Sequence, residues 1–504
     1  MASNGVEQPA TELQTFVPQD GSEKKSGSFN HGKYQVTNGN LDAEAAELLN
    51  GKDFDPFKAR NVEHPTSNCD TLTHLLKASL GSGILSMPLA FKYSGLAMGI
   101  VYTIIVAIIC THCAYILVKC AHALYYRTRT SAMSFADIGE QSCAEGPEWV
   151  RGYGKIVRAT ILGSLFATYF GTCSVYTVII AESFKAVIEQ YTEAVELRIY
   201  IAALLIPLIL LGFVPNLKYL APVSMVANGF MAIGLGITMY YLSVNLQPME
   251  NLSLAGSPFD LPPFLCIVIF AMEAIGVVMP LENNMKTPKN FLGLGGVLNQ
   301  GMAGVTLIYI MLGFLGYMAF GEETKDVITL NLPEKEIPAQ VVKIFIALAV
   351  FCTYGLQWFV CLEIIWNGLK DRYQKKAVLA EYIVRVILVV SSVLLAVAVP
   401  TIGPFIGLIG ALCFSILGII LPCFIECITF WEDGLGPGRW RLWKNILVSI
   451  FGVIVLIFGT KDSIAKIIQV YFPESAAYNA TLISNITATT VLDTTLSPTT
   501  LSTS

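Results

Sequence analysis

The sequence predicts an all-α membrane protein that crosses the bilayer about eleven times. Hydrophobic residues make up 54% of the 504 residues and charged residues only 14%, about half the charged share of a soluble domain. Several runs lack Asp, Glu, Lys and Arg, although a spanning helix needs only about 20 apolar residues. These runs cover 93–118, 159–181, 199–217, 219–249, 290–321 and 386–425. A soluble protein could not cover so many runs with polar surface.

The individual spans follow from the lengths of the apolar runs and from helix breakers. The run 386–425 is too long for one crossing and contains Pro400, Gly403 and Pro404, so we divide it into a ninth and a tenth span. The other spans are expected over residues 70–93, 96–124, 159–184, 199–216, 219–245, 262–283, 291–320, 339–368 and 443–471. Together they form a transmembrane domain over residues 68–472.

Two polar tails flank this domain. Residues 1–67 are rich in Gly, Ser, Asn and Glu, a composition typical of a disordered tail. Within it, Glu44, Leu48 and Leu49 have the acidic-x-x-x-Leu-Leu form of an endosomal or lysosomal sorting signal, and a short amphipathic turn is the alternative. Residues 473–504 are rich in Ser and Thr and are expected to be a glycosylated tail.

The distribution of basic residues predicts the orientation. Lys and Arg gather in alternate loops, at 125–158, 286–289, 370–376 and 439–444, and such loops face the cytosol. The N-terminus is then cytosolic, and an odd number of spans places the C-terminus outside or in a lumen. Glycosylation sequons at Asn251, Asn479 and Asn485 all fall on the predicted outer side.

Composition and motifs disfavour several classes of protein. Most of the twelve cysteines lie inside apolar runs, where they pack as small hydrophobes. The sequence shows no Cys/His metal-ligand spacing, no nucleophile–base set typical of an enzyme and no basic patch for nucleic acid. We therefore expect no metal, no cofactor and no enzymatic activity.

The first span carries the strongest functional signal. Gly81 and Gly83 flank Ser82 near its middle, with Ser79 one turn earlier. Glycine weakens a helix interior by about 1 kcal/mol, so this segment favours an unwound break, which a membrane tolerates only beside a protein cavity. The exposed N–H groups of such a break can bind a carboxylate. A small-residue packing face is the alternative interpretation.

The sixth span has a similar segment at its centre. Phe270 precedes Glu273 and Gly276, which places a carboxylate and a glycine in the middle of the span. A charge at the bilayer centre costs at least about 2.5–3.5 kcal/mol, so Glu273 is expected to face the protein interior or water. Interrupted spans that each begin a set of five helices indicate an inverted-repeat transporter.

His74 is the ionisable residue of most interest. It lies seven residues before Gly81, about two helical turns away and on nearly the same face. Histidine changes its charge near neutral pH, so His74 fits either a proton-coupling role or a structural hydrogen bond.

The segment 74–90 resembles the first span of the proton-coupled amino acid transporters, which belong to the amino acid/auxin permease group and have a LeuT-like fold of five plus five helices. The resemblance continues in order at 112–113, 117–122, 270–276, 280–286, 313–321, 328–333 and 353–357. It implies a broken first and sixth helix. It also implies that His74 corresponds to the family's essential histidine. Because Ala274 follows Glu273 where the family usually has Gly, the sixth-span break is expected to be tighter or shifted. Glu334 stands at the family's external disulfide position, so that disulfide is not expected.

The resemblance further implies proton-coupled symport of small neutral amino acids such as alanine and glycine, at the plasma membrane or in lysosomes, with growth-signalling partners for some members. On this reading the substrate carboxylate would bind N–H groups of Ser82, Gly83 and Ile84. Its ammonium group would bind carbonyl groups near Ser79 and Phe270. His74 would carry the proton, with Glu273 as the second candidate. An amino acid sensor with low transport capacity is the alternative; an ion channel would need a pore-lining filter, which the sequence does not show.

Overall fold

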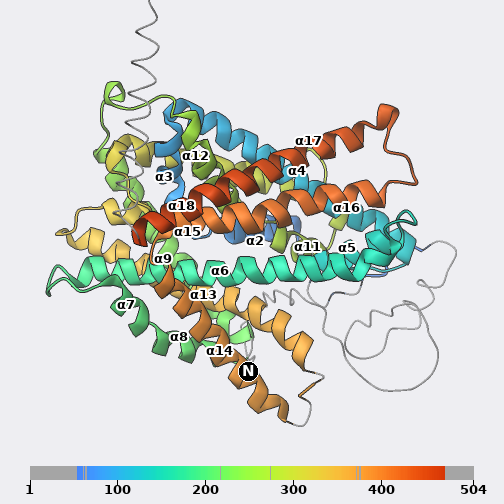
Figure 1. Cartoon of the computed structure of the whole chain (residues 1–504), viewed down its shortest axis with the longest axis horizontal. Coiled ribbons are helices and arrows are strands. Elements are labelled where there is room, and N and C mark those ends of the chain that lie inside the picture. Colours follow the sequence, from blue (N-terminus) through green and yellow to red (C-terminus); the bar gives the residue numbers. More distant parts are fainter. Residues whose placement is uncertain are drawn as a thin grey trace, which may run out of the picture.

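The computed structural model describes residues 54–60, 62, 65–215, 217–272, 274–370, 372–373 and 376–471. Within this part all regular structure is helical, apart from one isolated bridge between Thr66 and Met285. The helices form an elongated bundle, and the long helix α6 runs along most of its length (Figure 1). The apolar composition of the chain therefore produces the all-α architecture that the sequence predicts.

The first half of the chain begins with an interrupted helix. α2 (Asn68–Ser79), the 3-10 helix η1 (Ser82–Ser86) and α3 (Met87–Ser94) together make the first span. The next helices are α4 (Leu96–Thr128), α5 (Phe135–Ala144), η2 (Arg151–Tyr153), α6 (Gly154–Ile188), α7 (Leu197–Ala203), α8 (Leu205–Gly212) and α9 (Leu217–Val244), followed by the short turns η3 (Met249–Asn251) and η4 (Pro258–Asp260).

The second half also begins with an interrupted helix, made of α10 (Leu261–Met272) and α11 (Ile275–Asn283). It continues with η5 (Pro288–Phe291), α12 (Val297–Phe320), η6 (Gly321–Glu323), η7 (Ile328–Asn331), α13 (Ile337–Leu369) and α14 (Ala377–Ala398). α15 (Ile402–Ile409), the π-helix η9 (Gly410–Ile420) and α16 (Leu421–Thr429) form one long rod. η10 (Pro437–Arg439), α17 (Trp440–Ile454), the π-helix η11 (Val455–Gly459) and α18 (Thr460–Tyr471) complete the described part.

The span count agrees with the sequence-based expectation. In the described residues, nine helices are long and apolar enough to cross a membrane. The first span is divided by its break, and the shorter apolar helix 197–212 stands where the fourth span is expected. The chain is thus a multi-pass membrane protein with interrupted first and sixth helices. The inverted relation between its two halves stays a prediction.

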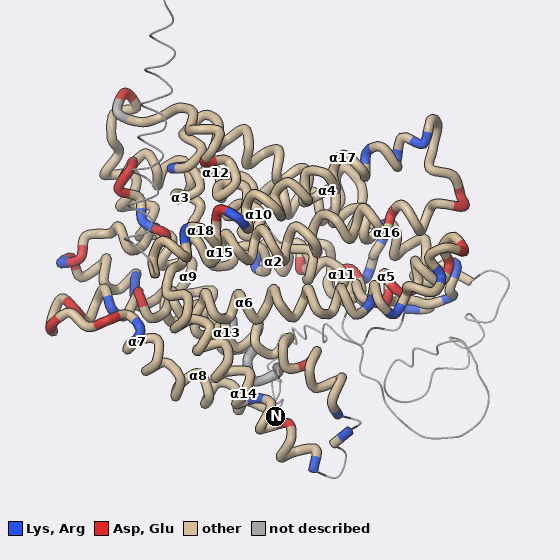
Figure 2. The backbone as a smooth tube through the Cα atoms, viewed as in Figure 1, with Lys and Arg blue, Asp and Glu red and all other residues tan. Residues whose placement is uncertain are grey.

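Charged residues gather at the two ends of the bundle and leave the middle almost bare (Figure 2). We call the end where α4 finishes and α6 begins the basic end, and the other the opposite end. α5 lies at the basic end, inside the stretch 125–158 that we expected to be a loop. Its start is a capping box, in which Ser134 and Asp137 satisfy each other's backbone N–H groups.

One predicted boundary is wrong. The ninth span begins at Ala377 rather than 386, because Glu381 and Arg385 pair within its first turns at 2.6 Å and can therefore lie inside a helix. The tail expected to be disordered through residue 67 contacts the transmembrane domain through Arg60, whose guanidinium donates to the carbonyl oxygen of Glu282 at 2.8 Å. The hydrogen-bond partners of Arg60 are Ser131 and Glu282, which lie 71 and 222 residues further along the chain, so the local sequence does not show this contact.

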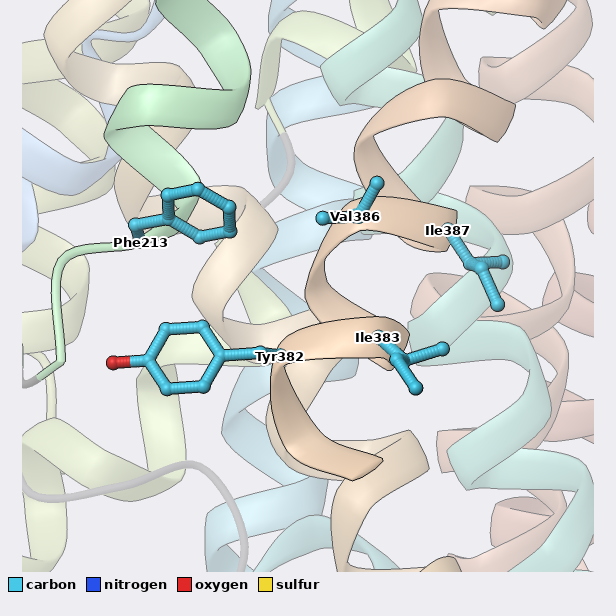
Figure 3. A pocket seen from close by; sticks show the side chains of 5 residues that line it. All are labelled: Phe213, Tyr382, Ile383, Val386 and Ile387. Atoms are coloured by element: carbon cyan, nitrogen blue, oxygen red, sulfur yellow. The ribbon is translucent and has the colours of Figure 1, made fainter. Parts of the chain in front are cut away.

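Arg385 also terminates helix α8. The last carbonyl groups of any helix lack intrahelical donors, and the Arg385 guanidinium donates to the carbonyl oxygens of Gly212 and Val214 at 2.8 Å each. Beside this helix end lies an apolar depression of about 300 Å³. Figure 3 shows its lining side chains, Phe213, Tyr382, Ile383, Val386 and Ile387.

Candidate functional site: the two helix breaks

The first break follows directly from its residue types. α2 ends at Ser79, and Gly81 has an extended backbone (φ −81°, ψ −161°) before the chain turns into η1. No side chain caps η1. The first N–H groups of any helix have no intrahelical acceptor. In η1 these are the N–H groups of Ser82 and Gly83. The predicted break is confirmed.

The second break lies where the sequence places Glu273, which itself falls outside the described residues. α10 ends at Met272 and α11 starts at Ile275, so the interruption is short, as expected from an alanine at position 274. Gly276 lies inside α11 rather than in the break. A Cβ atom at Gly276 would stand 2.3 Å from the hydroxyl oxygen of Tyr169, so this glycine makes room for α6.

The two breaks meet in space. A Cβ atom at Gly83 would stand 2.6 Å from the Cα atom of Ala271, a distance that no side chain tolerates. Glycine at position 83 therefore lets the backbones of η1 and α10 touch. Phe270 is buried next to this contact, with its ring centroid 5.7 Å from that of Phe414 on η9.

Tyr309 of α12 joins the two breaks and was not singled out from the sequence. Its hydroxyl lies 2.5 Å from the carbonyl oxygen of Ser79 and 2.8 Å from that of Ala271. These carbonyl groups lose their helical partners at the ends of α2 and α10. Since Tyr309 is fully buried, its single proton is shared between two carbonyl groups away from water.

Three hydroxyl groups around the first break remain unsatisfied within the described part of the chain. The Oγ atoms of Ser79, Ser82 and Ser86 are buried there without a hydrogen-bond partner. The Tyr176 hydroxyl lies close by, 3.8 Å from the position of a Cβ atom on Gly81. Native proteins rarely leave buried polar groups unpaired unless water or a ligand binds them. Predicted site residue Ile84 is buried in the same segment.

His74 lies on the face of α2 that the neighbouring helices leave most open. It is half-buried, while Asp70, Thr73 and Lys77 on the same face are exposed. The opposite face packs on α12, where a Cβ atom on Gly301 would meet Leu75 at 2.5 Å. An exposed polar stripe within a membrane span is expected to face water rather than lipid. His74 lies on α2 about two turns before the break, on the side of the break that leads to the basic end.

A buried charge cluster closes part of the basic end. The carboxylate of Glu282, at the end of α11, lies 3.2 Å from the Arg60 guanidinium and 2.9 Å from Nε2 of His122. The Tyr125 hydroxyl donates to the same carboxylate at 3.1 Å. Thr66 adds backbone hydrogen bonds to Asn284 and Lys286. Arg60 and Thr66 are thereby attached to the end of α11 and the residues that follow it.

Several predicted sites cannot be placed. The sorting-signal residues Glu44, Leu48 and Leu49 and the sequons at Asn479 and Asn485 lie outside the described residues. Asn251 lies in the turn η3, and its side chain is not described. Across the described ranges, no three His, Cys, Asp or Glu side chains form a group that could hold a metal ion.

Comparisons with known proteins agree on one family. The profile of the family described as "Transmembrane amino acid transporter protein" matches residues 64–465. The "Proton-coupled amino acid transporter-like protein pathetic" of Drosophila melanogaster is 56% identical over 94% of this chain and 98% of its own length. The "Probable amino acid transporter skat-1" of Caenorhabditis elegans is 26% identical over 82% of this chain and 92% of its own.

Solved structures match more distantly. A nucleobase-cation-symport-1 family transporter in a closed conformation with bromovinylhydantoin bound matches 82% of this chain and 94% of its own, with 13% identity and a TM-score of 0.46.

Proposed function

Because the chain belongs to the transmembrane amino acid transporter family, we propose that it carries small neutral amino acids such as alanine and glycine across the membrane together with protons. The Drosophila relative, 56% identical, has proton coupling in its name. The observation that carries the proposal is the meeting of the two helix breaks at Gly83 and Ala271.

The proposed substrate site lies at this meeting point. The substrate carboxylate binds the N–H groups of Ser82, Gly83 and Ile84, because these groups lie at the start of a helical segment, where those of Ser82 and Gly83 have no intrahelical acceptor and that of Ile84 has only a long bond of 3.4 Å to the Gly81 carbonyl oxygen. The substrate ammonium group binds carbonyl oxygens at the break ends near Ser79 and Phe270. The Tyr309 hydroxyl donates to the Ser79 carbonyl oxygen and so holds this acceptor in place. The same carbonyl oxygen then also accepts a hydrogen bond from the ammonium group.

Two features support a small substrate. The contact of Gly83 with the α10 backbone leaves little room between the breaks, and Phe270 and Phe414 form an aromatic wall beside it. The unpaired serine hydroxyl groups supply polar partners for the charged ends of an amino acid. A large side chain would have to displace one of these walls.

Protons are proposed to enter the cycle through His74, with Glu273 as the second candidate. The half-exposed position of His74 on α2 supports this role, because a proton carrier needs contact with water in at least one conformation. No cofactor beyond the coupling proton is required.

We further propose that the basic end faces the cytosol, in the plasma membrane or the lysosomal membrane, with Asn251, Asn479 and Asn485 glycosylated on the other side. A sensor that binds amino acids and transports few of them is the second candidate. The attachment of Arg60 to Glu282 favours it, because this contact links the N-terminal tail to the sixth span. Partners of growth signalling would then bind the tail.

Uptake of labelled alanine and glycine at external pH 5.5 and 7.5 tests the proposal. We expect several-fold faster uptake at pH 5.5, and collapse of this difference in His74→Ala with surface expression retained. Equal uptake by the wild type at both pH values would refute the proposed proton coupling. Saturable alanine binding to the purified protein without measurable uptake would refute the transporter function and favour the sensor function.

A further inference from the structure

Asp326 occupies an unusual place at the opposite end. It lies in the loop between η6 and η7, and its Oδ2 atom accepts a hydrogen bond from the N–H group of Gly403 at 2.6 Å. Gly403 belongs to the first turn of α15. A Cβ atom there would stand 2.9–3.0 Å from three atoms of the Asp326 carboxylate. Glycine at position 403 thus makes room for this carboxylate.

Several charged groups lie near Asp326, although α15 itself carries none. The two nearby lysines of α18 and α3 have other partners. Lys466 of α18 pairs with Asp462 at 3.0 Å and lies 4.4 Å from the ring centroid of Tyr93. Lys92 of α3 donates to the carbonyl oxygen of Glu322 at 2.5 Å. Four titratable groups on neighbouring helices interact electrostatically with Asp326: Lys92 and Tyr93 of α3, Glu182 of α6 and Lys466 of α18. The loop itself also carries Lys325.

Asp326 itself has no counter-ion at contact distance. Among the described residues, no Lys, Arg or His nitrogen lies within 4.0 Å of its carboxylate. A partly buried carboxylate with one backbone donor and no ion pair is costly when charged. Burial accordingly raises the pKa of the Asp326 carboxyl above its ordinary value, and the Gly403 hydrogen bond and the charges of Lys466 and Lys92 oppose this only in part.

The same loop holds the outer half of the first span. Lys92 of α3 is fixed to the loop at Glu322, while Asp326 fixes the loop to the start of α15. The carboxylate therefore lies where α3 and α15 are held together at the opposite end. Opening of this end would separate these elements and expose Asp326 to water.

We propose that Asp326 binds a proton when the opposite end closes and releases it when that end opens, so that it is a proton-binding residue of the transport cycle in addition to His74. This rests on the proposed proton-coupled function. The closed form binds the proton more tightly than a hydrated open form, so acidification favours closure and rising pH favours opening. A proton taken from an acidic outer compartment would thus help to close the end through which the substrate enters.

Hydrogen exchange tests the titration without relying on transport. The full-length protein in nanodiscs is compared at pH 5.5 and 7.5, with amide exchange of residues 401–403 corrected for its intrinsic pH dependence. We expect protection of this segment to be at least tenfold greater at pH 5.5 in the wild type. Asp326→Asn, which keeps the acceptor for Gly403 but cannot ionise, should be equally protected at both pH values. The same pH response in Asp326→Asn as in the wild type would overturn the proposal.

Two further variants separate titration from misfolding. Glu322→Gln removes an exposed carboxylate four residues earlier, in η6, and should keep the wild-type response. Asp326→Glu retains an ionisable group and should recover a pH response that Asp326→Asn lacks. Loss of the response in Glu322→Gln as well, or its absence in Asp326→Glu, would count against Asp326.

Alanine uptake by the same variants separates this inference from the proposed function. If Asp326 takes part in transport, Asp326→Asn should lose at least half of the pH dependence of uptake. If amide exchange of the wild type responds to pH but its alanine uptake does not, proton-coupled transport is refuted. Asp326 would then control closure in response to pH without coupling it to transport. Unchanged pH dependence of uptake in Asp326→Asn would refute its part in transport.

Discussion

Replacing Tyr309 by Phe removes one hydroxyl group from the place where the two interrupted helices meet. The ring is fully buried and keeps its packing, so the change isolates the contacts to the carbonyl oxygens of Ser79 and Ala271. The variant therefore tests whether these two hydrogen bonds hold the ends of α2 and α10 in the geometry that transport requires.

The distances allow an approximate magnitude. One proton serves one carbonyl group at a time, so the change leaves one buried carbonyl group without a donor, at a cost of about 1–3 kcal/mol. Hydrogen bonds between membrane helices average only about 0.6 kcal/mol, which favours the lower half of the range. We expect a cost near 2 kcal/mol, or about 30-fold in the equilibrium between intact and separated breaks.

The assay combines thermal melting of the purified protein with alanine uptake below saturation. Tyr309→Phe should melt at a lower temperature and take up alanine at least tenfold more slowly. Tyr317→Phe is the matched control, because Tyr317 is also fully buried on α12 but its hydroxyl donates to Glu322 at 3.0 Å, away from the breaks. Wild-type melting and uptake in Tyr309→Phe would refute the reasoning, as would an equal loss of uptake in Tyr317→Phe.

Two other substitutions test neighbouring contacts. Gly83→Ala places a methyl group 2.6 Å from the Cα atom of Ala271 and should abolish uptake, whereas Gly163→Ala, with no atom within 4 Å of the new methyl group, should retain it; normal uptake in the first variant contradicts the proposed meeting of the breaks. Glu282→Gln leaves the Arg60 guanidinium without its buried partner, a loss of about 3–5 kcal/mol in comparable pairs, and should lower the melting temperature clearly. In a double-mutant cycle with Arg60→Met, additive effects of the two changes would show that the pair does not couple.

The first break could be predicted from the sequence because its causes are local. Gly81, Ser82 and Gly83 weaken the helix where they stand, and no distant residue is needed to explain the interruption. The sixth-span break was found for a less direct reason. Glu273 drew attention to the segment, but Gly276, the glycine that seemed to mark the break, serves to admit Tyr169.

The contacts that complete the site could not be read from the sequence, because their partners lie far apart in the chain. Tyr309 looks like any aromatic residue of an uncharged span, and the carbonyl groups that it binds belong to residues 230 and 38 positions away. Arg60 and Glu282 are separated by 222 residues. A polar tail gives no local sign that its single arginine is buried in the transmembrane domain.

The short helix made of α7 and α8 has a consequence for the surrounding lipid. Its 16 residues, Leu197–Gly212, rise about 24 Å, while the hydrocarbon core of a bilayer is about 30 Å thick. In a bilayer of that thickness one end of the helix would lie inside the hydrocarbon region. If this is the Gly212 end, Arg385 supplies the donors that water cannot, and acyl chains would fill the depression beside Phe213 and Tyr382. A mismatch of several ångströms is relieved by local thinning of the bilayer, at a cost that grows with bilayer thickness. Thin membranes should therefore fit this side of the protein with less deformation than thick, sterol-rich ones.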